Sequence, residues 1–198
     1  MVGVASVVRA RPDGYTLLLS SASMSSAVNP HKSLPYDELR DLELVALSTQ
    51  PSVLVVAPGK GFRSVADLVA AAKAPPGELN FACAGIGSAS RIAGERFRLA
   101  AGLNVQHIPY RGPVEALADL MTGRIDFYFL PIAPALPLIK QGKVVALAVS
   151  TLRRVQLLPE VPTIAEAGYP NAEYLFWGAG YRRREKHRES SSRGSMVK

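Results

Sequence analysis

A loop of small and hydroxyl-bearing residues joins an apolar run to a helix-like stretch in LNFACAGIGSASRIAGERF, residues 79–97. The glycines of residues 85–88 let the backbone approach a ligand closely, and a helix that begins here offers unpaired N–H groups with a partial positive charge. Ser88 and Ser90 add hydroxyls. Such a site suits a carboxylate or a similar anion. In the other interpretation Ser88 only caps the helix at a structural turn, and the residues alone leave both open.

The same loop does not match two familiar nucleotide-binding patterns. A dinucleotide fingerprint needs a third Gly or Ala, and an acidic residue about 20 positions further on to hold the ribose. Here Ser90 stands at the third position, and residues 104–109 contain no Asp or Glu. A phosphate-binding P-loop is excluded as well, because no Gly-Lys-Ser/Thr follows the glycines.

Cys83 and His107 are the one pair of residues that suggests covalent catalysis, as nucleophile and base on neighbouring strands. A cysteine in the middle of a strand is more often a small core residue, so an enzyme is the less favoured alternative. The single cysteine excludes an internal disulfide. His31, His107 and His187 lack the spacing of metal ligands, and we expect neither a metal nor another cofactor.

Helix-like and strand-like segments alternate from about residue 15 to residue 168, which predicts an α/β fold. Ser64 and Asp67 match a capping box at the start of a helix that ends before Pro75. Thr163 and Glu166 repeat that pattern before a much shorter helix. We expect a buried strand at 15–20, further strands at 42–47, 53–57, 80–84, 104–108, 125–129 and 144–149, and further helices at 88–101, 114–122 and 133–141.

The net charge of +7 is concentrated at one end of the chain. Residues 181–198 hold seven Lys/Arg and two Asp/Glu, whereas the other 180 residues carry a net charge of +2. A basic stretch without apolar periodicity is typical of a disordered, solvated end, and we do not expect nucleic acid as a partner. No apolar run predicts a transmembrane helix, and residues 1–10 lack the apolar core and cleavage site of a signal peptide.

Short landmarks spread over residues 5–178 follow one another in the order found in a known receptor family. They are PDGYTLL (12–18), NP (29–30), LPYD (34–37), VLVV (53–56), PGELNF (76–81), GIGS (85–88), AGE (93–95), IPYRG (108–112), GK (142–143), ALAV (146–149) and LPEVPTIAEAG (158–168). Together they make the chain similar to the Bug-type extracytoplasmic receptors of tripartite tricarboxylate transporters. The resemblance implies a two-lobed, type II periplasmic-binding fold. It also implies a monomer that binds a small mono- or dicarboxylate in the periplasm and delivers it to membrane transporter subunits without catalysis.

The resemblance also assigns domains and ligand contacts. It implies a partial first lobe at 1–57, a second lobe at 58–150, a return segment to the first lobe at 151–180 and a disordered basic tail at 181–198. The second-lobe binding loop of the family corresponds to residues 85–91, and polar residues near 21–25 contribute from the first lobe. The expected ligand-binding residues are Gly85, Ile86, Gly87, Ser88, Ala89, Ser90, Arg91, Ser21, Ser23 and Tyr110.

The sequence also departs from the family pattern. Family members begin with a secretion signal, a first strand and a Pro-Gly-Gly loop that forms the first-lobe half of the carboxylate site, and this sequence has none of them. Arg91 stands where a histidine is common, and the residues after Trp177 no longer match. We therefore expect a receptor truncated at both ends, with an incomplete first lobe and with its export left open. The alternative is a remnant that does not bind ligand.

Overall fold

The computed structural model of the chain describes residues 2–21, 36–74, 79–85 and 87–185. Its larger lobe is built on a five-stranded sheet in the order β5-β4-β6-β3-β7. These strands are β3 (Ser52–Val56), β4 (Asn80–Cys83), β5 (Gln106–Pro109), β6 (Phe127–Pro131) and β7 (Val145–Val149). β4 pairs in parallel with β5 and β6, whereas β3 runs antiparallel to β6 and β7. The expected α/β class is confirmed.

Helices cover both faces of this sheet. α4 (Val65–Lys73) and α5 (Ala89–Ala101) share a core with one face, and α6 (Pro113–Met121) and α7 (Ile132–Lys140) share a core with the other. Successive side chains of a strand point to opposite faces, so Leu54 and Val56 of β3 enter the first core while Val53 and Val55 enter the second. The result is a three-layer lobe. None of the described helices is long and apolar enough to cross a membrane.

The helix starts follow the capping residues in the sequence. At the start of α4, Asp67 N–H donates to Ser64 Oγ at 3.1 Å and Ser64 N–H donates to Asp67 Oδ2 at 3.0 Å, which confirms the capping box. The same reciprocal pair forms between Thr163 and Glu166. There the backbone makes only turns, so the predicted short helix is wrong although its cap is present.

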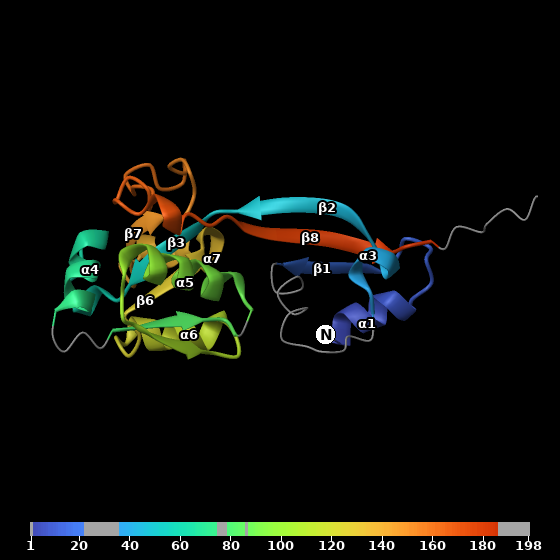
Figure 1. Ribbon diagram of the computed structural model, residues 1–198, viewed down its shortest axis with the longest axis horizontal. Coiled ribbons are helices and arrows are strands. Elements are labelled where there is room, and N and C mark those ends of the chain that lie inside the picture. Colours follow the sequence, from blue (N-terminus) through green and yellow to red (C-terminus); the bar gives the residue numbers. More distant parts are fainter. Residues whose placement is uncertain (1, 22–35, 75–78, 86, 186–198) are drawn as a thin grey trace, which may run out of the picture.

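The smaller lobe contains a three-stranded antiparallel sheet in the order β1-β8-β2. Its strands are β1 (Leu17–Ser21), β2 (Leu42–Gln50) and β8 (Phe176–Arg183), and α1 (Val2–Arg9) and α3 (Glu38–Asp41) accompany them. Val4 and Val7 of α1 pack against Tyr36 and Leu42 in a separate small core. Figure 1 shows the two lobes side by side, with the long strands β2 and β8 extending from the smaller lobe toward the larger one.

Two connections cross between the lobes, one from β2 to β3 and the other from Tyr174 into β8. A buried pair of hydroxyls holds them together. Ser150 Oγ donates to the Tyr174 carbonyl oxygen at 2.6 Å and lies 2.5 Å from Ser52 Oγ. Because Ser150 has a single hydroxyl hydrogen, Ser52 must be the donor in the second bond. These hydrogen bonds link both connections to Ser150, which follows directly after β7.

Three expectations about the first lobe need correction. β3 lies between β6 and β7, so the larger lobe begins at Ser52 and not at residue 58. A helix, α1, precedes the first strand, whereas the first helix expected from the sequence begins at Ser64. β1 is half exposed instead of buried, because it is an edge strand whose Leu17 and Leu19 are 60% and 84% exposed.

The basic tail begins later than expected. β8 continues to Arg183, and the arginines at its end bind neighbouring elements instead of water alone. Arg182 pairs with Glu43 at 3.1 Å, Arg183 donates to the Ala10 carbonyl oxygen, and Arg184 donates to the Leu42 carbonyl oxygen at 3.3 Å. Residues 181–185 therefore belong to the smaller lobe, whereas residues 186–198 lie outside the described part of the chain.

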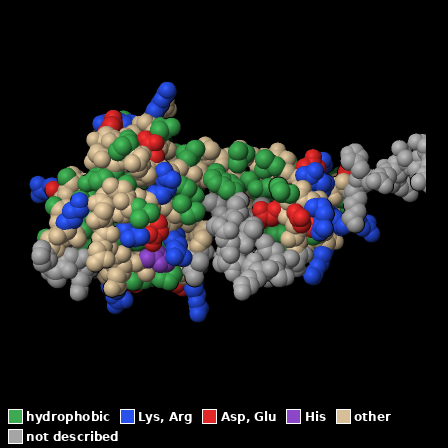
Figure 2. Space-filling view, viewed as in Figure 1, with side chains coloured by type: hydrophobic (Ala, Val, Ile, Leu, Met, Phe, Trp, Pro, Cys, Tyr) green, Lys and Arg blue, Asp and Glu red, His purple; other side chains and the backbone are tan. Residues whose placement is uncertain are grey.

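The outer strands of the smaller lobe carry exposed apolar side chains. Leu44, Val45 and Leu47 of β2 are 54%, 54% and 63% exposed. Figure 2 shows hydrophobic side chains gathered along this part of the molecule. Exposure of this extent on both outer strands of a sheet is unusual, because such side chains normally face a core.

Candidate functional site

A cleft of about 730 Å³ lies between the two lobes. The larger lobe contributes the loop after β4, the start of α5, the start of α6 and strand β6; the smaller lobe contributes all three of its strands. The described lining residues are Leu19, Ser20, Ser21, Ser48, Thr49, Gln50, Ala84, Ser88, Ala89, Ser90, Pro113, Tyr128, Pro131, Phe176, Trp177 and Gly178. Each of these side chains is electrically neutral at pH 7, and half of them carry a hydroxyl or an amide.

The start of α5 gives the cleft its positive pole. Gly85 and Gly87 adopt φ angles of +108° and +81°, which other residues rarely tolerate, and so turn the chain from β4 into the helix. Ser88 is the N-cap, and its Oγ accepts the Arg91 N–H at 3.3 Å. No acidic residue stands in the first turn of this 13-residue helix. The partial positive charge of the helix end is therefore not neutralised from within the helix.

Hydroxyl groups link this helix start to the sheet. Ser90 is 4% exposed, and its Oγ accepts the Ala84 N–H at 3.1 Å and lies 3.1 Å from Ser88 Oγ. Tyr128 of β6 also hydrogen-bonds to Ser90. Burial raises the pKa of Tyr128 to about 12, so the phenol stays neutral at physiological pH. These contacts hold Ser88 and Ser90 in place beside the cleft.

Four of the residues predicted from the sequence line the cleft together: Ser21, Ser88, Ala89 and Ser90. Four others, Gly85, Gly87, Arg91 and Tyr110, do not line it. The two glycines act through the backbone, by shaping the turn. Ser23 and Ile86 lie outside the described residues.

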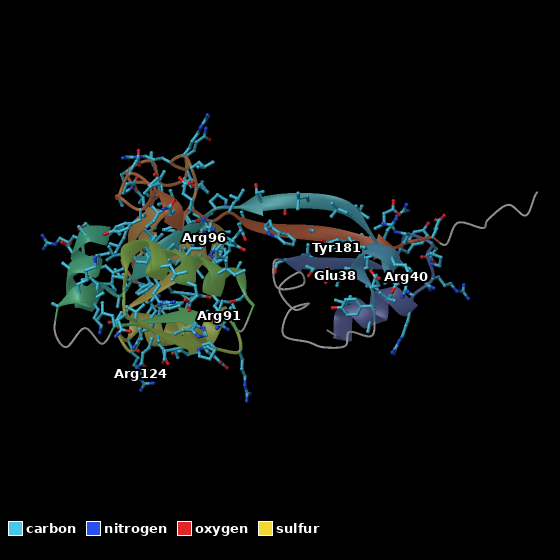
Figure 3. The ribbon with its side chains drawn as sticks, in the orientation of Figure 1. Glu38, Arg40, Arg91, Arg96, Arg124 and Tyr181 are labelled. Carbon is cyan, nitrogen blue, oxygen red and sulfur yellow. The ribbon has the colours of Figure 1, made fainter. Side chains whose placement is uncertain are left out.

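The side chains of Tyr110 and Arg91 have other partners or neighbours. The Tyr110 hydroxyl donates to Asp119 Oδ2 at 2.8 Å, and burial together with this carboxylate raises its pKa to about 12. Arg91 extends from α5 on the larger lobe (Figure 3), and its charge acts on His107. Neither side chain is among the described lining residues of the cleft, so a ligand contact of Tyr110 or Arg91 stays a prediction.

The structure places Cys83 and His107 in contact, with 2.7 Å between Sγ and Nε2. Cys83 is fully buried, and its thiol also donates to the Gly85 carbonyl oxygen at 3.2 Å. Neither residue lines the cleft. The contacts of this pair therefore stabilise the turn at Gly85. No group of three or more potential metal-binding side chains occurs among the residues that the structure describes.

Acidification is expected to reduce the free energy of unfolding through His107. Burial, and next the positive charge of Arg91, lower the pKa of His107 below its usual 6.5. The unfolded chain therefore binds a proton first as the pH falls below about 6.5, and this contribution to stability is lost with decreasing pH. The slope contributed by one such group cannot exceed about 1.4 kcal/mol per pH unit. Between pH 8 and pH 5, denaturant unfolding should show a smaller decrease in the free energy of unfolding for His107→Gln than for the unsubstituted chain. Equal decreases would contradict the role of His107 in this pH dependence.

Several residues that line the cleft were not predicted from the sequence. Tyr128 was hidden in an apolar strand, where its phenol was the one polar group of residues 127–131 that signalled a function. Thr49, Gln50 and Trp177 come from β2 and β8, which join the cleft only when strands about 130 positions apart pair with each other. Nothing local in the sequence marks such residues.

The two-lobed α/β architecture with a neutral, hydroxyl-rich cleft at the lobe junction is that of a solute-binding protein. The family model of the tripartite tricarboxylate transporter family receptor matches residues 1–180, and the chain belongs to this family. Among curated relatives, BugT of Bordetella pertussis is 38% identical over 182 residues, covering 90% of this chain and 56% of BugT. A protein from the tcbD-tcbE intergenic region of Pseudomonas sp. strain P51 is 38% identical over 179 residues, covering 89% of this chain and 53% of that protein. The chain thus spans about half the length of these relatives.

Solved structures agree with this assignment. The R. palustris protein Rpa4515 with adipate has a TM-score of 0.85 at 30% identity, over 92% of this chain and 62% of that one. MatC from Rhodopseudomonas palustris with bound malate has a TM-score of 0.80 at 27% identity, with coverages of 92% and 63%. The periplasmic binding protein BugD has a TM-score of 0.80 at 31% identity, with coverages of 92% and 62%. The expected family and fold class are confirmed, with the chain corresponding to part of each relative.

Proposed function

We propose that this chain forms the carboxylate-binding cleft of a solute receptor that delivers its ligand to the membrane subunits of a tripartite transporter. The observation that supports it best is the α5 N-terminus, with Ser88 and Ser90, facing a cleft between two lobes. The family consists of receptors, and relatives were solved with adipate and malate. The likeness to the periplasmic binding protein BugD supports a periplasmic location for the working receptor, and membership of a receptor family supports binding without catalysis as its task.

The chemistry of the site favours an anion held by neutral groups. The first N–H groups of a helix have no partner within it, and the N–H groups of Ala89 and Ser90 belong to this first turn. A carboxylate placed there accepts these hydrogen bonds and meets the positive end of the helix dipole. One hydroxyl hydrogen of the Ser88–Ser90 pair lies in the bond between their two oxygens, so the pair can donate at most one further bond to the ligand, without the desolvation that a buried arginine would require.

The wall of the cleft formed by the smaller lobe can bind the same ligand, and such binding would favour closure of the two lobes. Ser21, Ser48 and Thr49 of the smaller lobe reach the cleft from β1 and β2. A ligand bound at α5 can accept a hydrogen bond from the Thr49 hydroxyl when the lobes approach, whereas the Ser48 hydroxyl already donates to the Gly178 carbonyl oxygen at 3.2 Å. The two crossings beside Pro51 and Leu175 are the positions where rotation between the lobes must occur, because no other described connection joins the sheets. Such hinged closure is typical of ligand capture between two lobes.

Thermal unfolding with succinate, malate, adipate and benzoate tests the proposal, with the corresponding neutral amides as matched controls. A carboxylate at 100 times its dissociation constant should stabilise the chain by about 2.7 kcal/mol, whereas its amide should not. Cys83→Ser should keep this stabilisation, because Cys83 does not line the cleft.

Two outcomes would contradict the proposal. Absence of stabilisation by every acid would indicate a remnant that does not bind ligand. Loss of stabilisation in Cys83→Ser, with its folding intact, would instead favour the chemistry of the Cys83–His107 pair.

A further inference from the structure

The wall of the cleft opposite α5 is neutral and partly apolar. Leu19, Phe176 and Trp177 form its apolar part. Leu19 is 84% exposed and Trp177 is partly exposed, so both present apolar surface to a ligand. Its polar part consists of hydroxyls and one amide, from Ser20, Ser21, Ser48, Thr49 and Gln50.

The charged side chains of this sheet lie away from the cleft. Along β8, the first charged residue after Trp177 is Arg182, five positions further on, or roughly 16 Å at the rise of a strand. Arg182 is already paired with Glu43 at 3.1 Å. At physiological ionic strength this separation exceeds the screening length of about 8 Å. The described part of the sheet thus offers a ligand neutral hydrogen bonds and apolar contact, while the positive pole lies on the other lobe.

We infer that the cleft selects monocarboxylates with an uncharged, mainly apolar body, and that Trp177 is a residue that determines this specificity. This inference rests on the proposed function and narrows it to one class of acid. The single carboxylate lies at the start of α5, and the body of the ligand packs against Trp177 and Leu19. A second carboxylate reaching the far wall loses hydration there without gaining a cation from the described residues of that wall.

Hexanoate and adipate provide a matched pair of probes, since both have six carbons and differ only in the second carboxylate. Isothermal titration of the full chain should give a dissociation constant for hexanoate at least about tenfold lower than for adipate. Adipate binding as tightly as hexanoate, or more tightly, overturns the inference while leaving the proposed function intact. If no carboxylate binds, the proposed function itself fails.

Two variants test the far wall directly. Thr49→Lys places a cation beside Trp177, the cross-strand partner of Thr49, and should reverse the preference toward adipate. Because Thr49 is exposed, this change should not disturb folding. Trp177→Ala should weaken hexanoate binding about tenfold and adipate binding less. An unchanged ratio of the two dissociation constants in both variants overturns the role of this wall.

Discussion

Gly94→Val is expected to lower the free energy of unfolding by about 3 kcal/mol, because α5 packs directly on the ring of Phe81. A Cβ atom at position 94 would lie 2.3 Å from Phe81 Cε2 and 2.6 Å from Cδ2. The ring cannot easily retreat, since it is 1% exposed and lies 5.3 Å, centroid to centroid, from both Phe127 and His107. For a chain of this length the loss corresponds to a fall in Tm of roughly 6–12 °C, measurable by circular dichroism.

A surface variant of the same helix supplies the control. Ala100→Val introduces the same β-branched side chain at an exposed position of α5, and should cost only about 0.5 kcal/mol through helix propensity. The double variant Gly94→Val with Phe81→Leu should recover part of the loss, because the smaller side chain makes room. Equal losses in Gly94→Val and Ala100→Val would contradict the close contact between α5 and β4.

The larger lobe could be predicted well from the sequence because its signals are local. Capping at Ser64 and Ser88, the glycine at 102 that closes α5 in the left-handed region, and apolar runs bounded by turns all act over a few residues. The predicted strands and helices of residues 52–149 differ from the observed ones by about two residues at their ends. The loop before α5 could be singled out for the same reason, since its glycines and serines are adjacent in the chain.

The smaller lobe was harder to predict because contacts between residues distant in the sequence determine its structure. α1 is rich in valine, which favours strands, yet Val4 and Val7 form a helical face that packs on Tyr36 and Leu42. The arginines of residues 182–184 looked like a solvated tail, and only the pairing of β8 with β2 supplies their partners. The far wall of the cleft depends on the same long-range pairing, which leaves no local pattern.

The two lobes differ in how far their apolar side chains are buried. Leu19 and Leu47 of the smaller sheet are more than 60% exposed. The larger lobe has a buried core on each face of its sheet. Under the proposed function, ligand affinity depends on two separable conditions, namely an intact α5 site and a smaller lobe stable enough to close on it.

Ser88→Asp is expected to weaken carboxylate binding about 100-fold while leaving the fold intact, which isolates the first of these conditions. Aspartate caps helices as well as serine does, so the free energy of unfolding should change by less than about 0.5 kcal/mol. Its carboxylate would occupy the positive pole of α5 and repel a bound carboxylate. Two negative charges about 4 Å apart in a protein-like dielectric repel by up to about 4 kcal/mol, and even after screening the affinity should fall about 100-fold.

Ser88→Asn is the matched control for this change. Asparagine also caps the helix and has nearly the shape of aspartate, but it is neutral and can donate a hydrogen bond to the ligand. Titration calorimetry with hexanoate or succinate should therefore give a dissociation constant within about fivefold of the unsubstituted chain. If both the Asp and the Asn variant keep the affinity of the unsubstituted chain, the ligand carboxylate lies elsewhere. Loss of binding in both would show that the serine hydroxyl itself is required, and would assign recognition to hydrogen-bond geometry instead of the charge of the helix end.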